Sequence, residues 1–459
     1  MEPLLFNLLG EYHLGNKTKD FTMKLQFAFA LLALSTTTFA TVRIHEELFI
    51  PGQNPAIVRD LVSTGSVEID HVTSEGFELY GDKGLSKYLD SKKIPYIDMK
   101  SIKSSALADY PSSAQIAEKL RVAANKYPKI MKLINIGKSV KGKDLLVMKI
   151  SDNVNIEETE PEFKYISSMH GDEITGRELT VSLIEEIGQK YGSDSEITEL
   201  VNNTELYIMP SMNPDGSDMK QRGNAKFADL NRNFPDMTRD TTSTPAGREI
   251  ENQHVMAFQA GRQFSLSANF HGGTIVANYP WDSKYDLHPL DGFIKELSQG
   301  YSDLNPEMRA SSEFPGGITN GAAWYIVKGG MQDWSYVWHN DLQITVELSH
   351  QKWPDYSEIP GFYKDNRDSM IYFMKEVHRG AGIKFSRANV SGTVEIKQTS
   401  PAVKSLGSFA FKGSEFYKVM PEGDYTFTVK EKNATTKRMI NVRVEKNLIR
   451  SNGNYVSVN

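Results

Sequence analysis

Hydrophobic and polar positions repeat with two different periods along most of the chain. Between residues 111 and 383, short apolar runs alternate with longer stretches in which apolar residues recur every three or four positions. The short runs predict β-strands, and the longer stretches predict amphipathic helices. The expected strands are 145–150, 163–169, 206–210, 264–270 and 342–348, and the expected helices are 113–127, 174–191, 246–260, 290–301 and 363–379. This alternation predicts one α/β domain over 111–385, with helices on both faces of a mixed sheet.

Residues 41–100 form a smaller unit ahead of this domain, called the front unit below. Their pattern predicts strands at 42–49, 67–70, 76–80 and 96–99 and helices at 54–63 and 85–93. The resulting β-α-β-β-α-β order is typical of a ferredoxin-like α+β fold. Such a unit suggests a pro-segment or a chaperone-like module, joined by a linker over 100–110. We expect Asp70 and His71 within it to be surface or structural residues.

The pattern changes again over residues 386–459. Short alternating runs at 390–396, 408–411, 425–429 and 440–444 are separated by Gly and Pro turns. This arrangement is typical of a small β-sandwich. The region contains no histidine, so we expect it to have a structural or docking role.

The first forty residues carry a pattern of their own. Met23 and Lys24 precede the apolar run 25–34, and a small polar stretch ends at Ala40. A basic start, a short apolar core and a small-x-Ala ending predict a secretory signal peptide, and the run is too short for a stable membrane span. We therefore expect a signal segment within residues 1–40 and a secreted or periplasmic protein. The alternative is a buried helix at the start of the front unit.

Charge and cysteine usage narrow the chemistry. The 459-residue chain has a net charge of −6. It thus lacks the basic excess that favours binding to nucleic acid or to an anionic membrane, and we expect no nucleic-acid partner. Cysteine is absent, which excludes disulfides, thiolate metal ligands and a cysteine nucleophile. A bound metal would therefore need His and carboxylate ligands.

Side chains of ligand type follow two of the expected strands. His170 and Glu173 lie where a strand gives way to a helix, and His271 follows another apolar run. Two imidazoles and one carboxylate, with a fourth position for water, form a known set of catalytic zinc ligands. The spacing of His170 and Glu173 also arises by chance in polar loops, so the motifs farther along the chain decide between these interpretations.

A family resemblance appears in five motifs that follow one another in a fixed order. They are His170-Gly171-Asp172-Glu173, Asn213-Pro214-Asp215-Gly216, Asp229-Leu230-Asn231-Arg232-Asn233-Phe234-Pro235, His271-Gly272-Gly273 with Ala277-Asn278-Tyr279-Pro280, and Thr345-Val346-Glu347-Leu348. Over about residues 111–385 the chain resembles a zinc metallocarboxypeptidase of the carboxypeptidase N/E type. Residues 386–459 are similar to the transthyretin-like domain that follows the peptidase domain in this type. The front unit is similar to N-terminal domains of bacterial members.

The resemblance implies one zinc ion held by His170, Glu173 and His271, with water as the fourth ligand. The zinc would lower the pKa of that water and polarise the scissile carbonyl. Glu347 would be the general base that passes the water proton to the leaving amine, although a Glu in a strand can also face solvent or pair with a Lys. Asp229 resembles the carboxylate that orients a zinc-bound histidine, here His170, and its alternative is a turn residue.

The resemblance also implies how the substrate backbone is held. Arg222 matches the arginine that polarises the scissile carbonyl, and a surface Arg in a flexible loop is its alternative. Asn231 and Arg232 would bind the terminal carboxylate, because a planar guanidinium binds a carboxylate through two parallel hydrogen bonds. Tyr325 would close on the same carboxylate, and ordinary packing beside a Trp is its alternative.

Substrate choice would depend on Asp282, which matches the acid that pairs with a C-terminal Lys or Arg, and on Gln332 in the same pocket. The implied enzyme is a zinc carboxypeptidase that releases Lys or Arg from the C-termini of peptides and proteins, without an acyl-enzyme. Three further hypotheses remain open: a zinc carboxypeptidase for cell-wall peptides, a non-catalytic peptide-binding relative, and a front unit that keeps the enzyme latent.

Overall fold

The computed structural model describes residues 42–52, 61–62, 65–101, 110–446, 449 and 454–458. The expected signal segment, most of the helix expected at 54–63 and most of the linker expected at 100–110 lie outside these residues. Within the part of the chain that is described, no helix is both long and apolar enough to span a bilayer.

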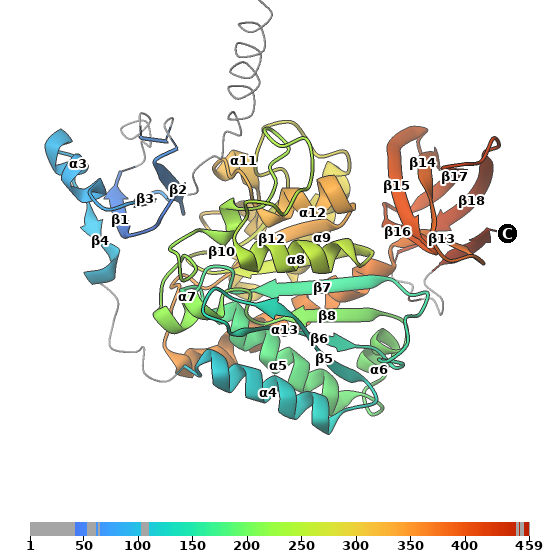
Figure 1. Cartoon of the computed structure of the whole chain (residues 1–459), viewed down its shortest axis with the longest axis horizontal. Coiled ribbons are helices and arrows are strands. Elements are labelled where there is room, and N and C mark those ends of the chain that lie inside the picture. Colours follow the sequence, from blue (N-terminus) through green and yellow to red (C-terminus); the bar gives the residue numbers. More distant parts are fainter. Residues whose placement is uncertain are drawn as a thin grey trace, which may run out of the picture. The chain divides into compact units, whose positions relative to one another are not determined.

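The central region is built on one eight-stranded mixed sheet (Figure 1) with the strand order β11-β10-β12-β9-β7-β8-β6-β5. The strands are β5 (Met131–Lys138), β6 (Asp144–Ile150), β7 (Glu162–Ser167), β8 (Glu205–Met209), β9 (Phe264–His271), β10 (Ile275–Tyr279), β11 (Ile318–Asn320) and β12 (Leu342–Leu348). Strands β8, β7, β9 and β12 are mutually parallel in that order. Their carboxyl ends therefore meet at one edge of the sheet, where α/β proteins bind ligands.

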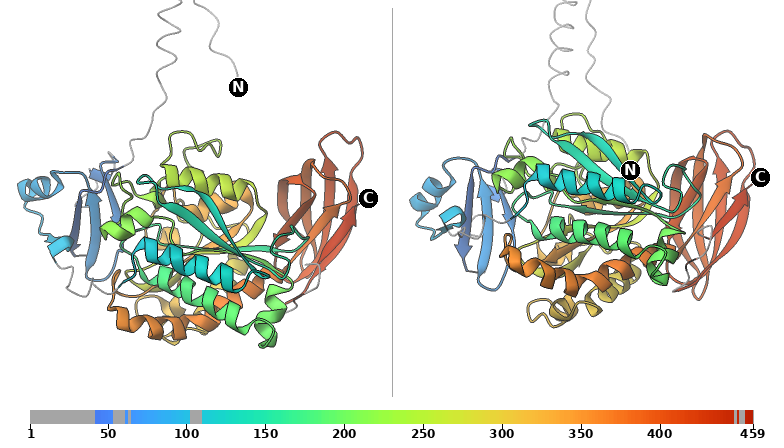
Figure 2. Two further views of the ribbon diagram at one scale, coloured as in Figure 1. Left: turned by 60° about the horizontal axis from the view of Figure 1, so that its bottom comes forward. Right: turned by 90° about the horizontal axis from the view of Figure 1, so that it is seen from below.

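Helices cover both faces of this sheet, which confirms the predicted α/β architecture. Figure 1 shows α4 and α5 on one side and α8 and α12 on the other, and Figure 2 shows α4 and α5 running side by side. The longer helices are α4 (Ser113–Lys126), α5 (Thr175–Lys190), α8 (Ile250–Ala260), α9 (Asp291–Asp303), α12 (Met331–His339) and α13 (Ile359–Lys375). Successive residues of a strand point to opposite faces, so Tyr165 packs in the core with Ile184 of α5, and Ile166 packs in the core with Met256 of α8.

The front unit has an antiparallel sheet with the strand order β2-β3-β1-β4. Its described elements are β1 (Glu46–Pro51), β2 (Val67–Asp70), β3 (Gly76–Gly81), α3 (Leu85–Lys92) and β4 (Ile97–Asp98). A small core that includes Ile50, Phe77, Leu79 and Leu89 holds α3 against the sheet. The ferredoxin-like fold of the front unit stays a prediction, because most of the helix expected at 54–63 lies outside the described residues.

The C-terminal region consists of two sheets with the orders β16-β13-β19 and β15-β14-β17-β18. The strands are β13 (Gly380–Phe385), β14 (Val390–Ser400), β15 (Lys404–Gly413), β16 (Glu415–Val419), β17 (Gly423–Glu431), β18 (Arg438–Val444) and β19 (Tyr455–Val458). Along β17, buried Tyr425, Phe427 and Val429 alternate with more exposed residues, which is the pattern of a strand with one buried face. We expected residues 380–385 in the central domain, but β13 pairs with β16 and β19.

Lys418 on β16 gives this region a testable pH dependence. Its side chain is 1% exposed and lies over the rings of Tyr336 and Phe409. Burial lowers the pKa of Lys418 from 10.5 to about 7. The unfolded chain therefore binds more protons between pH 7 and 10, and the free energy of unfolding should rise with pH across this window by on the order of 4 kcal/mol. Lys418→Met should remove that rise, whereas Lys430→Met at an exposed position should not, as measured by urea unfolding at both pH values.

Candidate active site

Three side chains of ligand type converge where β7 and β9 end. His170 and Glu173 lie in the turn between β7 and α5, and His271 is the last residue of β9. His170 Nδ1 lies 3.0 Å from Glu173 Oε1, and His271 Nδ1 lies 2.6 Å from Glu173 Oε2. All three residues are buried. The structure thus brings together the three residues that the sequence singles out as ligands.

The donor atoms of this cluster fit a metal ion. The Nδ1 atoms of His170 and His271 face each other at 3.0 Å, and two ring nitrogens repel at that distance unless a proton or a cation lies between them. Burial alone would raise the pKa of Glu173, but His170 and His271 outweigh it and hold this pKa well below its usual range. Two imidazoles and an ionised carboxylate directed at one point are a donor set that zinc accepts.

Asp229 and Arg222 surround the cluster. Asp229 Oδ1 lies 3.0 Å from His170 Nε2, which orients the ring so that Nδ1 points to Glu173. Arg222 donates from Nε to the other oxygen of Asp229 at 2.8 Å and from Nη1 to Glu173 at 3.2 Å. Burial opposes ionisation of Asp229, but Arg222 and then His170 hold the pKa of this carboxyl well below its usual range. Arg222 is fully buried, and so it is not a surface arginine.

Glu347 lies beside the cluster on β12. This strand pairs with β9 in parallel, and Glu347 is directly opposite His271 in the register. Apolar Ile344, Val346 and Leu348 alternate along β12 with polar residues, so the strand carries its polar side chains on one face. Glu347 is 3% exposed, and its Oε2 has no hydrogen-bond partner among the described residues. A buried carboxylate with one unpaired oxygen next to the imidazoles can accept a proton.

A cavity of about 20 Å³ lies between these residues and the other predicted substrate-binding groups. Its lining includes His170, His271, Glu347, Asn231, Arg232, Tyr325, Asn278 and Asp282. Asn231 accepts a hydrogen bond from the backbone N–H of Met331 at 3.0 Å, which ties the turn after Asp229 to the start of α12. Segments far apart in the sequence therefore contribute to one cleft.

The predicted specificity residues form a polar cluster at one side of the cavity. Asp282 Oδ1 accepts hydrogen bonds from Gln332 Nε2 at 2.8 Å and Asn278 Nδ2 at 3.1 Å. A Cβ atom on Gly321 would lie 1.8 Å from Asp282 Oδ1, so only glycine allows this close approach. Burial and then Asp333 raise the pKa of Asp282 well above its usual value.

Asp333 is a site residue that the sequence did not indicate. Its carboxylate accepts hydrogen bonds from the backbone N–H groups of Asp282 and Ser283, and from the Ser283 hydroxyl at 2.7 Å. These bonds hold the loop that carries Asp282. In the sequence, the feature that could have pointed to Asp333 was its position next to Gln332, in the first turn of α12.

We expected Asp70 and His71 to be surface or structural residues, and the surface alternative is wrong. They are 2% and 4% exposed, and Asp70 lines the cavity. Asp70 forms an ion pair with Arg222 and accepts a hydrogen bond from the Tyr325 hydroxyl. His71 Nε2 lies 3.8 Å from Glu347 Oε1. These contacts join the front unit to the central domain, and no local pattern in either segment indicates them.

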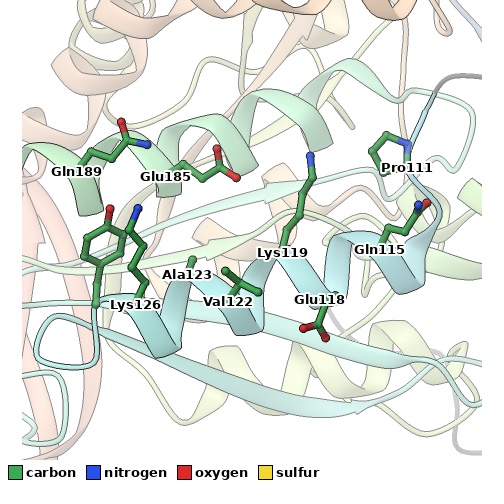
Figure 3. Close-up of a pocket in the computed structure, with 10 residues that line it drawn as sticks. Pro111, Gln115, Glu118, Lys119, Val122, Ala123, Lys126, Glu185 and Gln189 are labelled. Carbon is green, nitrogen blue, oxygen red and sulfur yellow. The ribbon is translucent and has the colours of Figure 1, made fainter.

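A separate open groove of about 560 Å³ runs between α4 and α5 (Figure 3). Lys119, Lys126, Glu118 and Glu185 are its charged lining residues, and its lining contains no histidine. It offers neither a ligand set nor a buried acid, so the candidate site is the cleft at the ends of β7, β9 and β12.

Sequence comparisons relate the chain to known proteins. A family model described as zinc carboxypeptidase matches residues 116–369. The chain is 38% identical over 369 residues to carboxypeptidase D of Homo sapiens, covering 72% of this chain and 26% of that protein. It is 35% identical to carboxypeptidase M of Mus musculus, covering 68% of this chain and 75% of that protein. The chain spans about a quarter of the length of the carboxypeptidase D relatives that it matches.

Solved structures share the fold. Carboxypeptidase A from Helicoverpa armigera aligns with a TM-score of 0.58 at 16% identity, covering 73% of this chain and 98% of that one. Thrombin-activatable fibrinolysis inhibitor aligns with a TM-score of 0.56 at 17% identity, covering 73% of this chain and 99% of that one. At these identities the likeness shows the fold alone.

Proposed function

The chain belongs to the zinc carboxypeptidase family, and from this premise we propose that it hydrolyses the last peptide bond of peptides and proteins and releases C-terminal Lys or Arg. The observation that carries the proposal is the convergence of His170, Glu173 and His271 beside the buried carboxylate of Glu347. We also propose that the protein is exported, either secreted or periplasmic, because a signal segment is expected within residues 1–40.

His170, Glu173 and His271 would hold one zinc ion, with Asp229 orienting His170. When bound there, zinc supplies a Lewis acid for the scissile carbonyl and lowers the pKa of water. Glu347 would accept the proton of the attacking water and deliver it to the departing amine. One carboxylate would thus serve both to activate the water and to protonate the leaving group.

Arg222 would stabilise the negative charge that develops on the carbonyl oxygen. Its guanidinium is buried and already held by Asp229, so little reorganisation is needed during the reaction. A fixed donor of this kind contributes about 3–4 kcal/mol to the transition state.

Asn231, Arg232 and Tyr325 would bind the terminal carboxylate of the substrate. They line the same cavity as Glu347 and the two histidines. A cationic site for a free carboxylate at this position would restrict cleavage to the last bond of a chain.

Asp282 and Gln332 would select the side chain of the last residue. A buried carboxylate is costly without a partner, and the raised pKa of Asp282 reflects that cost. A Lys or Arg side chain would supply the missing cation, whereas a Glu side chain would add a second negative charge.

The test is a set of peptides that differ only in the last residue, Lys, Arg, Phe or Glu, together with muropeptides that end in diaminopimelate. Because Asp70 lies against Arg222 and Tyr325, both the wild-type chain and Asp70→Ala are assayed by mass spectrometry. We expect release of Lys and Arg at least about 100-fold faster than release of Phe or Glu, lost on chelation and restored by zinc.

Two other outcomes would change the assignment. Faster cleavage of the muropeptides would assign the enzyme to cell-wall peptides. If neither zinc-loaded chain releases an amino acid from any peptide, the protein would be assigned as a non-catalytic peptide-binding relative.

A further inference from the structure

We propose that the loop between β6 and β7 binds one calcium ion through the side chains of Asp152, Glu158 and Glu160, called the loop carboxylates below. The loop precedes β7, whereas His170 follows that strand, so this metal site lies at the other edge of the sheet from the candidate active site. The inference concerns a second metal site and does not rest on the proposed hydrolysis.

The loop carboxylates converge on one point. One oxygen from each of them lies within 4.8 Å of an oxygen from each of the other two. Calcium binds oxygen ligands at about 2.3–2.6 Å, so two oxygens on one ion are at most roughly 5 Å apart. The spacing of the three side chains therefore suits a single calcium ion, whose coordination bidentate carboxylates and waters would complete.

Oxygens of the loop carboxylates lack other partners. Asp152 Oδ1, Glu158 Oε2 and Glu160 Oε2 are buried atoms without a hydrogen-bond partner among the described residues. The side chain of Glu160 is itself buried. A buried carboxylate oxygen with neither a donor nor a cation beside it is unfavourable. Three such oxygens in one loop indicate that a cation belongs between them.

The two basic side chains next to the loop are bound elsewhere. Lys149 Nζ lies 2.7 Å from Glu205 Oε1, and Arg262 Nη1 lies 2.5 Å from Glu157 Oε2. Within the described part of the chain, neither of these two residues forms an ion pair with a loop carboxylate. The negative charge of the loop carboxylates is therefore not balanced by the protein itself.

The electrostatics of Glu160 reflect this missing charge. Burial first, and then Glu158 and Asp152, raise the pKa of Glu160 to about 8. Glu205 acts in the same direction, and Lys149 opposes it only in part. A carboxyl group with a pKa in this range is surrounded by too little positive charge to stay fully ionised at neutral pH. A divalent cation between the loop carboxylates would supply that charge.

The ligand type and the backbone favour calcium over other ions. All the side-chain ligands are carboxylate oxygens, which hard cations prefer, whereas zinc and copper favour imidazole or thiolate ligands. Residues 151–161 form turns and bends. Calcium accepts the irregular geometry that such a loop offers, whereas Mg²⁺ requires a nearly ideal octahedron and keeps several of its waters.

A bound calcium ion would fix the loop against the segment that leads into β8. The backbone N–H of Asp152 donates to the carbonyl oxygen of Val201 at 3.2 Å, and the backbone N–H of Glu158 donates to Glu205 Oε1 at 3.2 Å. Both ends of the ligand set are thus already anchored on the same neighbouring segment. Calcium should stabilise the folded chain, because it binds the folded loop and not the unfolded one.

The experiment uses the full-length chain loaded with zinc, so that the candidate zinc site does not take up the added ion. Calcium binding is measured by isothermal titration calorimetry, and the melting temperature is measured with about 10 mM CaCl₂, with about 10 mM MgCl₂ and with neither, concentrations above the weak end of the range for calcium sites. The variants are Glu160→Gln and Asp152→Asn. The matched control is Glu157→Gln, the same change in the same loop at an exposed carboxylate that is already paired with Arg262.

We expect one calcium ion per chain, with a Kd of about 10⁻⁵–10⁻³ M. Calcium should raise the melting temperature by at least about 1 °C, and Mg²⁺ should raise it less. Glu160→Gln and Asp152→Asn should each weaken calcium binding at least about tenfold, because affinity depends on the number of charged ligands. Glu157→Gln should stay within about twofold of wild type.

The melting temperature without calcium separates a ligand from a structural residue. Glu160→Gln should melt no lower than wild type under that condition, because it removes a buried acid that has no partner, whereas a structural role for Glu160 would lower the melting temperature. No calcium binding by the wild-type chain, or binding that neither variant weakens, would overturn the site. An equal response to Mg²⁺ would overturn the assignment to calcium. Neither result would affect the proposed hydrolysis, since the measurements are ion binding and melting.

Discussion

Replacing Glu347 by Gln is expected to lower kcat by about 10²- to 10⁴-fold, the range in which a positioned general base contributes. Glutamine has the shape of glutamate but cannot accept the proton of the attacking water. Because Glu347 lies beside the ligand cluster and is not one of its three members, bound zinc should remain at one ion per chain. The comparison is also made in the Asp70→Ala background, because Asp70 forms an ion pair with Arg222.

The matched control is Glu395→Gln on β14, which makes the same chemical change at an exposed position. It should leave kcat unchanged. For each variant, zinc content is measured by elemental analysis and kcat is measured by single-turnover hydrolysis. Retention of more than about a tenth of the activity in Glu347→Gln, with zinc still bound, would assign the general base to another group.

Asp282→Asn is expected to remove most of the preference for a basic last residue. The ratio of kcat/KM for peptides ending in Arg and in Phe should fall roughly 30-fold or more, because a buried charge pair is typically worth about 2–5 kcal/mol. Asparagine keeps an oxygen that can accept the hydrogen bonds from Gln332 and Asn278, so the loss reports on charge. Cleavage of the Phe peptide should change little.

Asp286→Asn serves as the control for this prediction. Asp286 lies in the same loop as Asp282 but is exposed. Its substitution should leave the Arg-to-Phe ratio within about twofold. If Asp282→Asn behaves like this control, Asp282 does not contact the substrate side chain.

A helix or strand of the central domain could be predicted where its periodic apolar pattern runs along the full length of a buried element. The strand expected at 342–348 is β12 (Leu342–Leu348), and the helix expected at 113–127 is α4 (Ser113–Lys126). Strand β5 (Met131–Lys138) was missed because it lies at the edge of the sheet, where partial exposure interrupts its apolar pattern. Edge strands bury less surface, and their sequences carry a weaker signal.

The metal cluster was predictable for a related reason. His170 and His271 follow strands whose apolar runs are clear in the sequence, and the topology of an α/β sheet brings the ends of such strands together. The structure places their Nδ1 atoms 3.0 Å apart. The roles of these residues are proposals that the zinc and activity measurements test.

By itself, the sequence determined the α/β alternation, the ligand-type residues at the strand ends and the absence of cysteine chemistry, because each depends on residue type and local period. Only the tertiary structure decided that Asp70 and His71 lie against Arg222 and Glu347. An acid and a histidine next to each other are ordinary in a turn, and nothing nearby in the chain distinguishes a solvated pair from a buried one. Their burial depends on how the front unit packs against the central domain, and that packing is spread over many residues with no periodic pattern.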